Sequence, residues 1–486
     1  MTEKSSPAEQ PRSAPPRKRQ QKQKKHRRRK GMCLEDRPIL EPHAAGIDIG
    51  AREIFVAVPP DRDPNPVRVF ATFTEDLEQT ADWLLRCGIK TAAMESTGVY
   101  WIPLYDVLET KGIQPCLVDA SHMKNVPGRR TDWHECQWLQ YLHSVGLLRA
   151  AFRPDAEVCA VRILMRHRSE LVAMASQHVQ HMHKALTQMN FQIQHVISDL
   201  TGVRGLAIVD AILAGERDPG ALAQLRDCRI KASEEAIRKS LVGNCRPEHL
   251  FTLRQSRDLY GIYQQQIVAC DQEMEKLLRV LQPRVDPTEQ PLPPDRKRSR
   301  KKNQKKSGHH CGAGFDLRTE VYKLYGVDVT QIPGLDTMAL SLFTEVGRDL
   351  SRWPTAAHFA SWLSLCPDND ISGGRVLWKG ARLVKNRAGQ MFRLAAYTLH
   401  SSPTPLGAYL RRMKVKLGPA AATTATAHKL AVIFYTMVTK QVEYDETMWA
   451  AQDALRQTRL ATRLKRQAEQ LGYKLIPIET QSSVSR

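Results

Sequence analysis

The sequence predicts an α/β domain with a mixed sheet, then a long helical region and a second, mostly helical domain. Three observations support this fold class. Short apolar runs alternate with helical patterns over residues 44–146, and an apolar seam with spacings of three and four follows over residues 161–196. Helical periodicity then returns from residue 315 to about residue 450. The chain of 486 residues also has room for several domains, because single cores rarely grow beyond ~250–300 residues.

Five strands and three helices are predicted in the first domain, which we place at residues 41–154. AGIDIG, EIFVAV and VRVFATF have the composition of consecutive strands, and TAAMES and IQPCLVDA are the fourth and fifth. EDLEQTADWLLRC, IPLYDVLETKG and TDWHECQWLQYLHSVG have helical spacing, with Thr131 as the expected N-cap of the last helix. This order of elements fits an RNase H-like (RuvC-like) sheet, in which the first and fourth strands are neighbours and the last helix crosses their ends.

The helical region at residues 155–282 has a coiled-coil pattern. Ten of the eleven seam positions are apolar, and Arg168 is the exception. Its expected partner is the helical pattern around 255–281 of the same chain, or another subunit. An ordinary buried helix would give a similar pattern.

The other segments differ in composition. Residues 1–40 are predicted to be a disordered basic tail, residues 283–314 a disordered basic linker, and residues 451–486 a polar helical tail. The C-terminal domain occupies residues 315–450. Its QIPGLDTMALSLFTEVG segment resembles half of a helix-hairpin-helix, in which backbone N–H groups hold a phosphate.

Composition excludes several classes of protein. A hydrophobic fraction of 42% excludes a wholly disordered chain, and no apolar run approaches the ~18 residues of a membrane span. The closest cysteines, Cys228 and Cys245, are too far apart for a CxxC zinc site. The N-terminus lacks an apolar signal segment. We therefore expect a cytoplasmic protein with no membrane partner.

The net charge of +21 is concentrated in three segments. Residues 1–30 carry +10, residues 296–306 carry +8 and residues 375–393 carry +6, so the rest of the chain is nearly neutral. Clustered Lys and Arg favour nucleic acid as the partner, although the first two segments could simply be solubilising tails. The third segment lies among apolar residues and predicts a folded basic surface. Its candidate nucleic-acid-binding residues are Arg375, Lys379, Arg382, Lys385, Arg387 and Arg393.

Four carboxylates are candidate metal ligands. Asp48 lies in the first strand and Glu95 ends the fourth, while Asp132 and Glu135 share one face at the start of the last helix. Each acid alone is what a turn or a helix start often carries, but the predicted topology brings all four together. Clustered carboxylates repel one another unless cations lie between them, and their oxygens suit Mg²⁺ or Mn²⁺. Two such ions support phosphodiester chemistry.

A serine precedes the third basic segment. Ser372 comes directly before Gly373 and Gly374, and two glycines let a phosphate approach the backbone. Serine is a poor nucleophile unless a base or a metal activates it, and this segment contains no evident base. These residues alone fit an ordinary turn serine better than a nucleophile.

Five motifs together carry a resemblance to a known family. GIDIG, MESTGVYWIPLYDVLE, KNVPGRRTDWHECQWLQYLHSVGLL, TQIPGLD and ISGG resemble, in order, the DEDD-type transposases of the insertion sequence 110 family. The resemblance runs from about Gly46 to the helical region after Ser372.

The resemblance implies a RuvC-like domain whose Mg²⁺ ligands are Asp48, Glu95 and Asp132. The fourth ligand is usually Asp and is here Glu135, which is one methylene longer. It implies Ser372 as the DNA nucleophile, forming a phosphoserine intermediate. It also implies donor and target DNA as substrates, a structured guide RNA from the element and a homo-oligomer, dimer or tetramer, held partly by coiled coils.

The sequence thus predicts a site-specific recombinase of a bacterial insertion sequence. One alternative is a RuvC-like metal-dependent endonuclease acting on branched DNA, in which Ser372 is structural. The other is a catalytically inactive nucleic-acid-binding protein.

Overall fold

The computed structural model describes residues 37–96, 98–118, 131–197, 199–225, 232–294, 314–378, 380 and 386–474. The chain divides into two compact units, Met1–Phe152 (unit 1) and Arg153–Arg486 (unit 2). Most of the expected basic tail, residues 295–313 of the expected linker and the last twelve residues lie outside the described residues. None of the described helices is both long and apolar enough to cross a membrane.

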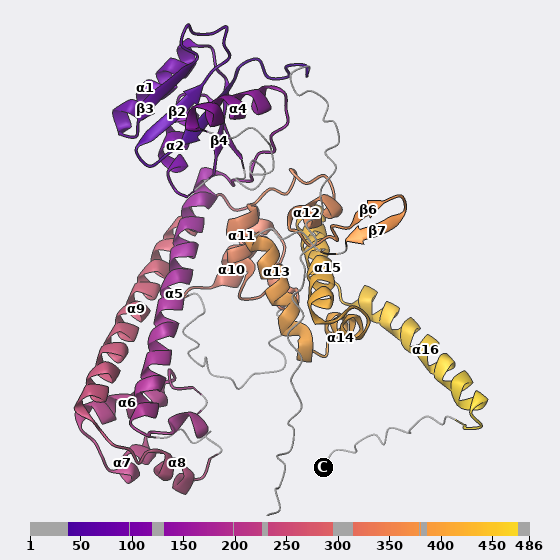
Figure 1. Ribbon diagram of the computed structural model, residues 1–486. Coiled ribbons are helices and arrows are strands. Elements are labelled where there is room, and N and C mark those ends of the chain that lie inside the picture. Colours follow the sequence, from indigo (N-terminus) through magenta and orange to yellow (C-terminus); the bar gives the residue numbers. More distant parts are fainter. Residues whose placement is uncertain are drawn as a thin grey trace, which may run out of the picture. The chain divides into compact units, whose positions relative to one another are not determined.

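Unit 1 contains the predicted five-stranded mixed sheet (Figure 1). The strands follow the order β3-β2-β1-β4-β5, in which β2 runs antiparallel to β1 and β3, and β4 runs parallel to β1 and β5. This is the RNase H-like arrangement that the sequence predicted. The strands are β1 Ala44–Ile49, β2 Glu53–Ala57, β3 Val67–Ala71, β4 Thr91–Glu95 and β5 Gln114–Val118.

The two faces of the sheet are covered by different helices. Helices α1 (Thr74–Arg86) and α2 (Trp101–Thr110) pack on one face, where they bury Ile47 of β1 and Met94 of β4. Helix α4 (Asp132–Ser144) covers the opposite face. Side chains alternate between the faces along each strand, so residues next to Ile47 and Met94 point toward α4.

Helix α4 lies directly on β1 at Gly46. A Cβ atom there would lie 2.1 Å from the backbone nitrogen of Gln140 and 2.2 Å from the carbonyl oxygen of Cys136. The other end of α4 lies near the start of the sheet, because the backbone nitrogen of Leu40 donates to the carbonyl oxygen of Ser144 at 2.8 Å. Helix α4 therefore runs antiparallel to β1, and its N-terminus lies at the C-terminal ends of β1 and β4.

In unit 2, helices α5 (Ala156–Gln188) and α9 (Pro247–Val280) pack along their lengths. The seam partner is thus present in the same chain, one of the two arrangements that the sequence left open. Arg168, the polar exception, forms a buried bidentate ion pair with Asp271, with Nε–Oδ1 and Nη2–Oδ2 distances of 2.5 and 3.2 Å. Short elements join the two helices and extend their core: η2 Ile193–His195, α6 Val203–Ala214, α7 Pro219–Gln224 and α8 Glu234–Ser240.

The rest of unit 2 is a helical domain with one two-stranded hairpin. Phe359, Phe392 and Phe434 meet in its buried core. Its elements are α10 Leu317–Tyr325, η4 Val329–Gln331, α11 Ala339–Val346, α12 Ala356–Trp362, β6 Asp370–Ser372, β7 Arg375–Trp378, α13 Arg387–Thr398, η5 Leu399–Ser401, α14 Pro405–Leu417, α15 Pro419–Lys440 and α16 Thr447–Gln470.

Two features of this domain bear on the sequence predictions. Residues 283–294 of the expected linker are exposed or half-buried, and the backbone nitrogen of Arg284 donates to the carbonyl oxygen of Lys323 at 2.7 Å. The Pro333-Gly334 turn, in the segment that resembles half of a helix-hairpin-helix, lies against α13: a Cβ atom on Gly334 would lie 2.6 Å from the carbonyl oxygen of Ala395. Close packing therefore explains this glycine without a ligand.

Candidate functional site

Asp48 and Glu95 lie on neighbouring strands and point to the same face. The parallel register pairs Gly46 with Ala93 and Ile47 with Met94, so Asp48 and Glu95 come next. Gly46 and Ala93 face α4. Because side chains two residues apart share a face, both carboxylates project toward the α4 side, where they are half-buried.

Helix α4 brings Asp132 to the same edge of the sheet. The helix begins after the N-cap Thr131, whose hydroxyl oxygen accepts from the backbone nitrogen of His134 at 3.4 Å, as the sequence predicted. From Cys136, which lies over Gly46, Asp132 is one turn nearer the helix N-terminus, about 6 Å along its axis. Asp48 lies a similar ~6–7 Å beyond Gly46 along β1. Asp132, on α4, is therefore level with Asp48, which lies on the sheet face that α4 covers.

The Cys136 thiol is buried under α4 and feels two of these acids. Burial raises its pKa to about 12, and the negative charges of Asp48 and Asp132 add to the rise. The two carboxylates come from different elements, and both act on this one thiol. Glu135, three residues after Asp132, lies half-buried on the same first turns of α4.

The four acids share one edge of the sheet without forming a closed set of ligands. Among the residues that the structure describes, no three His, Cys, Asp or Glu side chains are close enough together to hold a metal ion. Their donor chemistry fits a hard divalent cation, because all four supply carboxylate oxygens.

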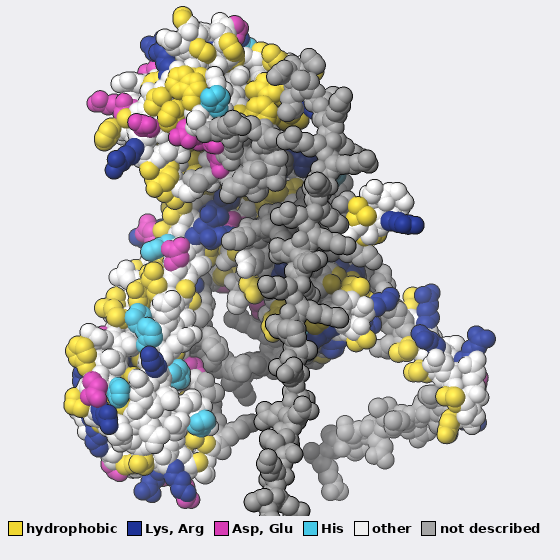
Figure 2. Space-filling view, in the orientation of Figure 1, with side chains coloured by type: hydrophobic (Ala, Val, Ile, Leu, Met, Phe, Trp, Pro, Cys, Tyr) yellow, Lys and Arg dark blue, Asp and Glu magenta, His cyan; other side chains and the backbone are white. Residues whose placement is uncertain are grey.

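Ser372 lies at the tip of the β6–β7 hairpin in unit 2. Ser372 pairs with Arg375 across the turn, and Gly373 and Gly374 have φ values of +55° and +74°. Positive φ at both central residues defines a type I′ turn, which favours glycine. The turn therefore explains the glycine pair, and it leaves Ser372 and Arg375 exposed. Figure 2 shows a basic side chain on this hairpin and others along α16.

The predicted basic residues have different environments. Arg375 and Arg387 are exposed, while Lys379, Arg382 and Lys385 lie outside the described residues. Arg393 is half-buried, and its guanidinium group donates to the carbonyl oxygen of Ser364 at 2.7 Å. Burial lowers the pKa of Arg393. This contact holds α13 against the end of α12, and binding of nucleic acid by Arg393 stays a prediction.

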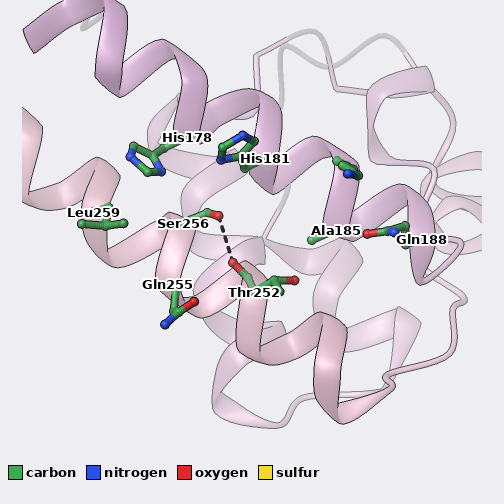
Figure 3. A pocket seen from close by; sticks show the side chains of 9 residues that line it. His178, His181, Ala185, Gln188, Thr252, Gln255, Ser256 and Leu259 are labelled. Carbon is green, nitrogen blue, oxygen red and sulfur yellow. Dashed lines mark hydrogen bonds between the residues drawn. The ribbon is translucent and has the colours of Figure 1, made fainter.

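Two of the hollows in the described part of the chain are of interest here, and neither was predicted from the sequence. One lies in unit 1 between β3 and α4, beside Trp133. The other, of about 330 Å³, lies between α5 and α9, where His178 and His181 line one wall and Gln255 and Ser256 the other (Figure 3). The signal in the sequence for the second hollow was the spacing of His178, His181 and Lys184, which places them on one face of a helix. The packing of α5 against α9, which forms the hollow, could not be predicted from the sequence.

Comparisons with known proteins fall on both units. Residues 45–191 match a model of DEDD transposases from IS110 elements, described as a transposase. Residues 328–401 match a model described as the transposase IS116/IS110/IS902 family. The first match contains Asp48, Glu95, Asp132 and Glu135, and the second contains Ser372. No curated protein gives a significant match.

Proposed function

The chain belongs to the IS116/IS110/IS902 family of transposases, and from this premise we propose how it cleaves and joins DNA. It is a DNA transposase, and the family implies a divalent metal ion. We propose that it is the recombinase of a bacterial insertion sequence and exchanges strands through a phosphoserine. The observation that supports this most strongly is the convergence of Asp48, Glu95 and Asp132 on one edge of the sheet.

Asp48, Glu95, Asp132 and Glu135 are the proposed ligands of Mg²⁺ or Mn²⁺. The bound cation would supply Lewis-acid stabilisation of charge at the scissile phosphate. Without it, four carboxylates at one edge repel each other. Asp48 and Glu95 provide the fixed part of the set, because neighbouring strands hold their backbones in register. Asp132 and Glu135 provide the part that depends on the seating of α4.

Ser372 is the proposed nucleophile. Its hydroxyl oxygen forms a bond to phosphorus while the bond from phosphorus to the leaving sugar oxygen breaks. The serine loses its proton, and the leaving oxygen takes one up. The phosphodiester energy is kept in the serine–phosphate bond and is recovered when a new strand end attacks it. The exposed tip of a two-stranded hairpin suits this role, because it can reach a DNA backbone without rearranging the core. Arg375 and Arg387 would contact phosphates nearby.

The guide and the assembly state also belong to the proposal. The family resemblance supports a structured RNA encoded by the element and a homo-oligomer, dimer or tetramer. The basic segments at residues 1–30 and 296–306 suit additional contacts with DNA or RNA, because clustered Lys and Arg displace counterions from a polyanion.

Two variants separate this proposal from its alternatives. Asp48→Asn and Ser372→Ala are compared with the unaltered chain on donor and target DNA, with the flanking element RNA and Mg²⁺, and with and without a chelator. The proposal predicts that both variants lose strand exchange and retain DNA binding. Cleavage by Ser372→Ala with none by Asp48→Asn would instead support a metal-dependent endonuclease. DNA binding without any metal-dependent cleavage by the unaltered chain would support an inactive binding protein.

A further inference from the structure

A groove of about 480 Å³ lies next to the acidic edge of unit 1, between the edge strand β3 and the first turns of α4. It begins at Trp133, the residue that follows Asp132. The other lining residues are Asn65, Pro66, Val67, Arg68, Val69 and Gln137.

The groove has an apolar floor, an aromatic wall and amides at its rim. Val67 packs with Cys136 under α4, and Val69, two residues on, points to the same side with 45% of its surface exposed. The Trp133 side chain is 43% exposed, although burying a large aromatic side chain gives a large gain in free energy. Asn65 and Gln137 are exposed, so their side-chain amides can form hydrogen bonds with a ligand.

The charge of the groove favours a neutral ligand. Among the described residues that line it, Arg68 is the one that carries a charge. Its guanidinium group donates to both carboxylate oxygens of Asp63 at 3.1 and 2.8 Å and lies 4.9 Å from the centre of the Trp83 ring. Its charge is thus already compensated, so none of the described lining residues offers an unpaired positive charge to a phosphate. A flat ring with polar edges fits this chemistry, with its face on Trp133 and its edge toward the amides.

We propose that this groove holds an unpaired nucleobase of the DNA strand whose phosphate lies at the carboxylates. The proposal rests on the proposed function, because it takes the position of the scissile phosphate from Asp48 and Asp132. Trp133 and Asp132 are consecutive residues, so a base on Trp133 belongs to a nucleotide beside that phosphate. Stacking would position the strand and would favour bases released from the duplex.

Photocrosslinking of the full chain tests this contact. Single-stranded DNA that carries 5-iodouracil at successive positions is irradiated with the protein, and the crosslinked peptides are identified by mass spectrometry. RNA of the same sequence and the DNA duplex are tested in parallel. Salt is raised until contacts of Lys and Arg with phosphates are suppressed, because stacking depends less on salt. We expect a crosslink at Trp133 with single-stranded DNA and little with duplex.

Binding by three variants completes the test. We expect Trp133→Ala to lose the crosslink and to bind single-stranded DNA at least about 5-fold more weakly, as for other stacking aromatics. Trp133→Phe should keep both properties, since it keeps an aromatic face. Phe73→Ala is the matched control, because Phe73 is an aromatic residue of the same unit, 76% exposed and outside the groove. It should bind like the unaltered chain.

Three results would overturn the inference. They are equal affinity of Trp133→Ala and the unaltered chain, crosslinks only at other residues, and a Trp133 crosslink with RNA alone, which would assign the groove to an RNA base. Strand exchange by Asp48→Asn would instead refute the proposed function. That outcome is distinguishable, because binding and crosslinking at Trp133 do not require cleavage.

Discussion

Replacing Gly46 with alanine tests how α4 positions the site. The added Cβ atom would lie 2.1 Å from the backbone nitrogen of Gln140 and 2.2 Å from the carbonyl oxygen of Cys136. Carbon contacts are comfortable only at about 3.5 Å or more. Both obstacles are backbone atoms in the middle of a helix, so no side chain can rotate away. Helix α4 must therefore move off β1 by on the order of 1 Å.

This displacement has two consequences of different size. Overpacking of this kind costs about 1–3 kcal/mol, and we expect the upper part of that range because backbone must move. The shift also carries Asp132 and Glu135 away from Asp48 and Glu95. A misplacement of about 1 Å at a reacting centre can lower the rate roughly 100-fold. Activity should therefore fall much further than the folded fraction of the protein.

Chemical denaturation followed by circular dichroism gives the stability, and strand exchange under single-turnover conditions gives the rate. The control is Gly261→Ala in α9, where the new Cβ would meet no backbone atom and only the end of the Arg257 side chain, at 3.4 Å. It should stabilise its helix by up to about 1 kcal/mol. If Gly46→Ala unfolds and reacts like the unaltered chain, the close seating of α4 on β1 does not position the carboxylates.

Three further predictions concern other parts of the chain. Arg168→Met should destabilise unit 2 by about 3–5 kcal/mol in urea unfolding, because it leaves Asp271 buried without a counter-charge. The double variant Arg168→Met, Asp271→Leu should recover most of that lost stability. Burial lowers the pKa of His143 below its usual 6.5. The Nε2 atom of this side chain lies 2.9 Å from the hydroxyl oxygen of Thr91. Protonation therefore favours the unfolded state: the His143 contribution to stability is complete above about pH 6.5 and is lost as the pH falls toward the lower folded-state pKa. Unfolding of His143→Gln should depend less on pH over this window, and equal dependence would contradict the assignment. Gly374→Val should strain the type I′ turn and reduce strand exchange, whereas Gly374→Asn should be tolerated in the same assay, since Asn accepts positive φ.

The sequence was most informative where structure is local. The five strands and three helices of unit 1 follow from runs of apolar residues and from helical spacing, and the structure has them in the predicted order. Thr131 was recognisable as an N-cap because it precedes a helical pattern with acids in its first turn. Given the sheet order, the neighbouring positions of Asp48 and Glu95 also follow.

Features that depend on tertiary contacts were not predictable in this way. Arg168 was an unexplained exception in an apolar seam, because Asp271 lies 103 residues away in sequence. Arg393 belongs to a basic run by composition, but composition carries no information on burial, and its guanidinium group binds a helix end. The groove at Trp133 forms only because α4 folds back beside β3. The sequence also did not indicate that Gly46 lies under a helix.

A covalent adduct at Ser372 is the most direct test of the central claim that both units act in one strand-exchange reaction. The full chain is incubated with donor and target DNA, the flanking element RNA and Mg²⁺, quenched under denaturing conditions, and digested for mass spectrometry. We predict a nucleotide attached to the Ser372 hydroxyl oxygen, absent when the metal is chelated and absent in Asp48→Asn. Strand exchange under these conditions without an adduct at Ser372 would contradict the mechanism.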